Sequence, residues 1–99
     1  MLNITKQKQE QALTVLLEGR LDTTTAPELE RALREDVSDV TALCLDLGKL
    51  EYISSAGLRV LLSMQKIMNR QGSMKLIGVN DTIMEIFEIT GFCDILTIE

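Results

Sequence analysis

Residues 43–58 read Leu43-Cys44-Leu45-Asp46-Leu47-Gly48-Lys49-Leu50-Glu51-Tyr52-Ile53-Ser54-Ser55-Ala56-Gly57-Leu58, and they decide the fold. Its apolar beginning belongs to the run Thr41–Leu47, which is typical of a central strand that helices cover on both faces. The second half predicts a tight serine-glycine corner at which a helix starts. Either Ser54 or Ser55 is suited to cap that helix, because a serine side chain can accept a hydrogen bond from an unpaired backbone N–H group.

The same corner also favours a negative group. Unpaired N–H groups and the helix macrodipole make the start of a helix a favourable place for a phosphate. Two interpretations of the serines therefore stand side by side: an ordinary helix cap, and a serine that is phosphorylated.

The segment before this stretch predicts a hairpin and then a helix. Leu2–Thr5 and Ala12–Glu18 are β-prone runs, and the polar segment Lys6–Gln11 between them is expected to be the hairpin connection. Thr25 is the expected N-cap of a helix that begins near Ala26, with a capping box three residues later and a proline in the first turn. Helical spacing indicates that its buried face comprises Ala26, Leu29, Leu33 and Val37.

The segment after the corner predicts strands that alternate with helices. A long, largely buried helix is expected from Ser55 or Ala56 to Arg70, followed by a strand at Met74–Val79. Asn80 or Asp81 is expected to cap a third helix that ends at Thr90-Gly91, and Cys93–Ile98 has the composition of a last strand. We therefore predict an α/β fold: one domain over residues 1–99, with an opening hairpin, a mixed β-sheet and helices packed on it.

The composition narrows the possible functions. A chain of 99 residues with 45% hydrophobic residues suits one core, and a net charge of -5 argues against binding nucleic acid. No apolar run approaches the length of a membrane span and no signal peptide is evident, so we expect a cytoplasmic protein with no membrane partner. Without histidine there is no imidazole acid, base or metal ligand, and we expect no enzyme activity, cofactor or metal site. Cys44 and Cys93 are expected to be buried as small apolar side chains.

Two motifs resemble those of the STAS domain family, which includes the bacterial anti-sigma-factor antagonists. Gly19-Arg20-Leu21-Asp22 resembles the family's Gly-x-Leu-Asp segment, and the stretch from Leu45 to Leu58 resembles its strand, loop and phosphoserine corner. The resemblance extends over the whole chain by the order of its elements. Aligning Gly57-Leu58 places Ser55 on the family's phosphoserine. Three residues differ from the family pattern. Ser54 stands in place of an aspartate, Ala56 stands in place of a hydroxyl residue, and Arg59 stands where a small residue is frequent.

The resemblance implies an antagonist that binds an anti-sigma factor, which is itself a serine kinase. Phosphorylation of Ser55 would switch this antagonist off. A metal-dependent serine phosphatase would reset the cycle. The implied partner-binding surface consists of Asp22, Thr23, Ser54, Ser55, Gly57 and Leu58. Two alternatives remain: an unphosphorylated scaffold or subunit of a larger complex, of the stressosome or lipid-transport kind, and a small ligand-binding module.

Overall fold

A four-stranded mixed sheet is the framework of the molecule, for which the computed structural model describes residues 1–99. The strands β1 (Leu2–Gln9), β2 (Ala12–Leu21), β3 (Ala42–Ile53) and β4 (Ser73–Ile77) lie in the order β1-β2-β3-β4. β1 pairs with β2 antiparallel, whereas β2, β3 and β4 are parallel. The predicted mixed sheet with an opening hairpin is therefore confirmed.

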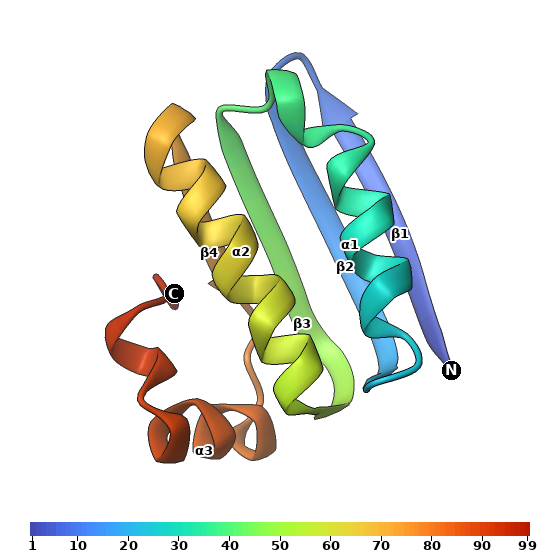
Figure 1. Ribbon diagram of the computed structural model, residues 1–99, viewed down its shortest axis with the longest axis vertical. Coiled ribbons are helices and arrows are strands. Elements are labelled where there is room, and N and C mark those ends of the chain that lie inside the picture. The colour runs from blue at the N-terminus through green and yellow to red at the C-terminus, as the bar shows by residue number, and fades with distance from the viewer.

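The helices are α1 (Ala26–Arg34), α2 (Ser55–Gln71) and α3 (Asp81–Thr90). Figure 1 shows α1 and α2 side by side in front of the sheet, with α3 at its lower end. The apolar side chains between these layers form one core of 25 buried residues, so the chain makes a single compact domain. None of the three helices combines the length and the hydropathy that crossing a membrane requires.

The helix starts agree with the cap residues in the sequence. α1 begins at Ala26 and α2 at Ser55, as predicted. Asn80 caps α3, since its side-chain oxygen accepts a hydrogen bond of 2.9 Å from the Ile83 N–H. Gly91 ends α3 in the left-handed conformation, with φ of 81°, which glycine adopts without steric cost.

The opening hairpin is longer than its polar sequence indicated. The prediction that Lys6–Gln11 is a connection was wrong, because β1 runs to Gln9 and only two residues turn the chain. Lys6 and Lys8 lie on the helix side of this edge strand, where their ammonium groups meet Asp36 at 2.9 Å and Asp39 at 2.7 Å. The pairing of β1 with β2 therefore includes both lysines, and these ion pairs neutralise them.

β3 is central in the sheet, but helices cover only one of its faces. Leu43, Leu45 and Leu47 are buried against the helices, whereas Cys44 and Asp46 are only half-buried on the far face. The expectation of cover on both faces was therefore wrong. The strand also runs six residues further than predicted, to Ile53. In the second half of β3, register shifts against β2 place extra residues in the strand. The side chains that point into the core are therefore every third residue there, instead of every second one.

The C-terminal segment is not the strand that was expected. Phe92–Asp94 forms a short 3₁₀ helix, because Asp94 and Ile95 donate backbone hydrogen bonds back to Gly91 and Phe92. The chain then reaches the sheet only at a single bridge between Ile98 and Leu76. The β-prone composition of Cys93–Ile98 was thus misleading, since local turns use the backbone groups that a strand would need.

The charge of the molecule is unevenly distributed along the chain. All 10 Lys and Arg residues precede Leu76, whereas five of the 15 acidic residues follow it, in α3 and the C-terminal segment. These five are Asp81, Glu85, Glu88, Asp94 and Glu99, and all are exposed. The C-terminal quarter therefore accounts for the whole net charge of -5.

Candidate functional site

The serine corner, which comprises Ser54–Leu58, joins the end of β3 to the start of α2. Ser54 has an extended backbone and is the N-cap of α2: its Oγ accepts a hydrogen bond from the Gly57 N–H at 3.3 Å. Its carbonyl oxygen accepts from the Leu58 N–H at 2.9 Å. Ser55 is the first residue of the helix and is exposed. Of the two serines, Ser54 is therefore the structural one, and the Ser55 hydroxyl is not needed as the cap.

The corner is tied to the end of the neighbouring strand β2. The Ser54 N–H donates to the Leu21 carbonyl oxygen at 2.9 Å, and Gly57 lies directly against the side chains of Leu21 and Ile53. Gly57 and Leu58 are both buried. Of the six residues in the predicted partner-binding surface, these two hold the helix start in place beneath the exposed ones.

Asp22 and Thr25 organise the turn that lies beside the corner. Asp22 Oδ1 accepts from the N–H groups of Thr24 at 3.0 Å and Thr25 at 3.1 Å. These hydrogen bonds, with the Thr25 N–H as the main cause, hold the pKa of the Asp22 carboxyl below its ordinary value. Thr23, between these residues, is exposed.

Thr25 does not cap α1 with its side chain, so the predicted capping box with Glu28 is wrong. Its Oγ1 instead donates to the Arg20 carbonyl oxygen at 2.8 Å and accepts from the Asp22 N–H at 2.9 Å. The hydroxyl is thus used to close the turn after β2, because that turn contains backbone groups that would otherwise be unpaired.

An open groove runs from the corner between α1 and α2. Its volume is about 290 Å³, and Thr23 and Ala56 lie among the residues that line it. The others are Ala26, Pro27, Glu30, Arg59, Val60 and Ser63. The groove is thus continuous with the exposed part of the predicted partner-binding surface.

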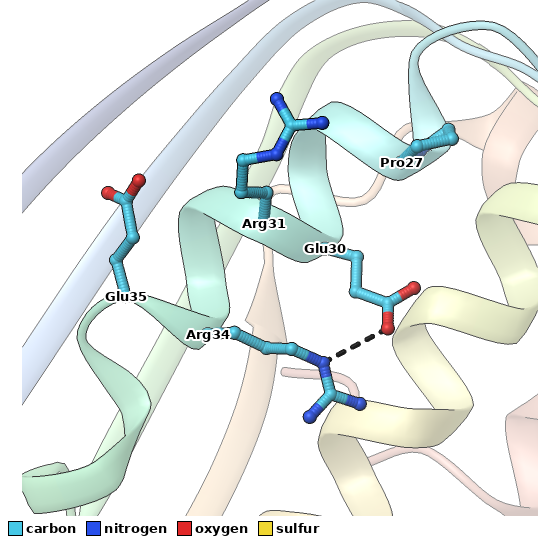
Figure 2. A pocket seen from close by; sticks show the side chains of 5 residues that line it. All are labelled: Pro27, Glu30, Arg31, Arg34 and Glu35. Atoms are coloured by element: carbon cyan, nitrogen blue, oxygen red, sulfur yellow. Dashed lines mark hydrogen bonds and ion pairs between the residues drawn. The ribbon is translucent and has the colours of Figure 1, made fainter.

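The charged surface of α1 borders this groove. Figure 2 shows Glu30 and Arg34 reaching toward α2, where Arg34 Nε lies 3.0 Å from Glu30 Oε2, while Arg31 and Glu35 extend to the other side of the helix. With Pro27 these residues line a hollow of about 470 Å³ that has no hydrophobic lining residue. As the hollow lies on the surface of one helix, we interpret this face as a solvated one.

Sequence reasoning missed an exposed pair next to the corner. The Arg20 guanidinium lies 4.5 Å from the centre of the Tyr52 ring, and its Nε is 4.0 Å from Asp22 Oδ2. Arg20 and Tyr52 are register partners on β2 and β3, so only the strand pairing brings them together. Tyr52 is 38% exposed, and an exposed Arg-Tyr pair has the composition of a protein-binding surface.

The cysteines are partly buried rather than fully buried, and both are free thiols. Burial raises the pKa of the Cys44 thiol above its ordinary value, which disfavours the reactive thiolate. No group of three or more Asp, Glu and Cys residues has the arrangement of a metal site. The exposed polar groups of the corner are therefore the candidate functional groups of this molecule.

Comparison with known proteins shows the family to which this chain belongs. The anti-sigma-B factor antagonist of Staphylococcus aureus is 34% identical over 97 residues, which cover 96% of this chain and 90% of that protein. The crystal structure of an anti-sigma factor antagonist from Mycobacterium paratuberculosis superposes with a TM-score of 0.89 at 22% identity, covering 99% of this chain and 85% of that one. The phosphorylated form of the Bacillus cell fate determinant SpoIIAA superposes with a TM-score of 0.77 at 15% identity, covering 98% and 91%. The STAS domain model matches residues 3–99, and the chain belongs to the STAS domain family.

Proposed function

We propose that this protein is an anti-sigma factor antagonist whose partner is a serine-kinase anti-sigma factor. The contact surface consists of the exposed Thr23 and Ser55 and the half-buried Asp22 and Ser54, and the buried Gly57 and Leu58 support it from below. The antagonist names of its relatives support this role. The protein acts by occupying its partner and has no catalytic step of its own.

Phosphorylation of Ser55 switches the interaction off. In the kinase, the γ-phosphoryl group of ATP passes to Ser55 Oγ, the hydroxyl proton goes to a base of the kinase, and ADP leaves. A metal-dependent serine phosphatase returns the serine by hydrolysis of the same phosphate ester. Both steps take place in the cytoplasm, where ATP and the sigma factor are available.

The observation that carries this proposal is that Ser54 caps the helix while the neighbouring Ser55 is exposed. Ser54 caps α2, so a phosphate on the neighbouring Ser55 leaves the capping hydrogen bond from Gly57 in place. The phosphate adds about -1.5 to -2 charges and three acceptor oxygens at a helix start that tolerates them. The corner then changes its charge while the fold stays the same, so a partner that fits the neutral serine is rejected.

The test is phosphorylation by the cognate kinase. The purified protein is incubated with the serine-kinase anti-sigma factor of its own host and with Mg-ATP, and intact mass and peptide mapping locate the phosphate. We expect one phosphate, on Ser55, in the wild type and in Ser54→Ala, and none in Ser55→Ala. Calorimetry with the same partner is expected to show binding by Ser55→Ala and a loss of at least tenfold in affinity for Ser55→Asp.

Two results would contradict the switch: an unmodified Ser55, and equal binding by Ser55→Ala and Ser55→Asp. Ser54 stands where the family resemblance has an aspartate, which favours the second candidate function, a constitutive scaffold in a larger assembly. Affinity capture from the native host separates the two functions. A histidine-kinase-like ATPase supports the antagonist, whereas a transporter or a multimeric scaffold supports the alternative.

A further inference from the structure

Arg59 lies one helical turn after Ser55 on the same side of α2. Residues four apart on a helix have Cβ atoms about 5–6 Å from each other, and a helical side chain leans toward the N-terminus of its helix. Ser55 and Arg59 are both exposed. The long Arg59 side chain therefore leans back toward the turn that carries the Ser55 hydroxyl.

Arg59 is also without an ion-pair partner, whereas three other charged groups near the corner have one. Asp22 accepts hydrogen bonds from its own turn, Arg20 stacks on the Tyr52 ring, and Glu30 binds Arg34. No ion pair involves Arg59 in this structure. Arg59 is one of the residues that line the groove between α1 and α2, and its charge has no fixed partner there.

We propose that Arg59 is the internal counter-ion of phosphorylated Ser55. The inference rests on the proposed function, because it concerns the phosphorylated state of that same serine. An acidic group that precedes an arginine by four residues is the favourable order for a helical ion pair. A guanidinium also binds phosphate oxygens with two parallel N–H donors.

Capture of Arg59 adds a second component to the switch. In the unphosphorylated protein Arg59 lines the groove, and its guanidinium is free to bind a carboxylate of the partner. Once phosphoserine holds it, the groove loses this cation at the moment when the corner gains a dianion. One covalent change thus makes the corner negative and neutralises the positive charge of Arg59 at the groove.

The test uses protein in which phosphoserine is incorporated at position 55 during translation, so that it needs no kinase. The three proteins compared carry the wild-type background, Arg59→Gln or Arg70→Gln. Arg70 is a matched control, since it is an exposed arginine of the same helix at about 22 Å along its axis from Ser55. At about 0.1 M salt this distance exceeds the Debye length of about 10 Å.

The readouts are the ³¹P resonance of the phosphoserine during a pH titration and the Nε–Hε resonance of Arg59. The other charged groups near the corner, which include Asp22, Arg20, Glu30 and Glu51, are the same in all three proteins. We expect the second pKa of the phosphate, about 6 in free phosphoserine, to be higher by roughly 0.2 to 0.4 in Arg59→Gln. Arg70→Gln should match the wild type, and the Arg59 resonance should shift when Ser55 is phosphorylated.

Equal phosphate titrations in the wild type and Arg59→Gln would overturn the inference. The same holds if Arg70→Gln changes the titration as much as Arg59→Gln, because the effect would then be a general charge effect. A kinase that ignores Ser55 would refute the proposed function and leave this ion pair unaffected, so the two failures are distinguishable.

Discussion

Replacing Gly57 by alanine tests how closely α2 and β2 are packed at the serine corner. A Cβ atom at Gly57 would lie 2.7 Å from Leu21 Cγ, 2.9 Å from Ile53 Cγ1 and 3.0 Å from Leu21 Cδ2. Neither neighbour has room to move away, since Leu21 is fully buried and Ile53 is 3% exposed. The helix start must therefore shift away from the sheet to admit one methyl group.

The size of the effect follows from two opposed terms. Forcing an extra methyl group into a packed core costs about 1–3 kcal/mol, whereas alanine is more favourable than glycine inside a helix by about 0.5–1 kcal/mol. We expect Gly57→Ala to lower the free energy of unfolding by about 0.5–2 kcal/mol. For a domain of this size, 1 kcal/mol corresponds to a decrease of about 4–8 °C in Tm.

Urea denaturation followed by circular dichroism measures this loss, and a double-mutant cycle assigns its cause. Leu21→Ala removes the two Leu21 atoms that the new methyl group would meet, so Gly57→Ala should cost at least 0.5 kcal/mol less in that background. Two results would refute the packing argument: a Gly57→Ala protein as stable as the wild type, and an equal cost in both backgrounds.

Three other substitutions test the caps and the turn around the site. Ser54→Ala removes the acceptor of the 3.3 Å hydrogen bond from Gly57, and it should lower the free energy of unfolding in urea by about 0.5–1 kcal/mol. Ser54→Asp restores an acceptor and adds a favourable charge at the helix start, so it should be more stable than Ser54→Ala. Asn80→Ala loses both the α3 cap and the 2.8 Å hydrogen bond to the Leu50 carbonyl, so it should lower the free energy of unfolding by about 1.5–2.5 kcal/mol. Asn80→Ser keeps the cap, and its loss of stability should be about half as large. Asp22 has a lowered pKa, so its carboxylate stabilises the fold above its ordinary pKa of 3.8, and this contribution is lost as the pH falls through the lower folded value. The urea midpoint of wild type should therefore fall more steeply than that of Asp22→Asn below pH 3.8, and parallel curves would contradict this account.

Local signals in the sequence were sufficient for the parts of the fold that local chemistry decides. The helix starts at Ser55 and Asp81 follow from capping residues, the start at Ala26 follows from apolar spacing and the proline of the first turn, and the end of α3 follows from Gly91. The exposure of Ser55 follows in the same way, because it belongs to the first turn of a helix whose buried face is evident from its pattern.

The parts that depend on tertiary contacts could not be predicted. Lys6 and Lys8 belong to a strand because β1 pairs with β2 along its whole length, and acidic groups after α1 neutralise the two lysines on the helix side. β3 continues to Ile53 because bulges allow every third residue to face the core in its second half. This spacing of buried residues differs from the alternation that is typical of a strand. The Arg20–Tyr52 pair depends on strand register alone, and no spacing rule within one segment relates the two residues.

The confinement of the net charge to α3 and the C-terminal segment gives the molecule an electric dipole, with the acidic pole at α3 and a balanced body behind it. α3 is anchored next to the end of β3, since Asn80 donates to the Leu50 carbonyl, so this pole lies toward the same end of the molecule as the serine corner. In a diffusional encounter with a basic surface, we expect the field to turn the molecule before any contact forms. The productive orientation is then selected during approach, and raising the salt concentration should slow association far more than it speeds dissociation.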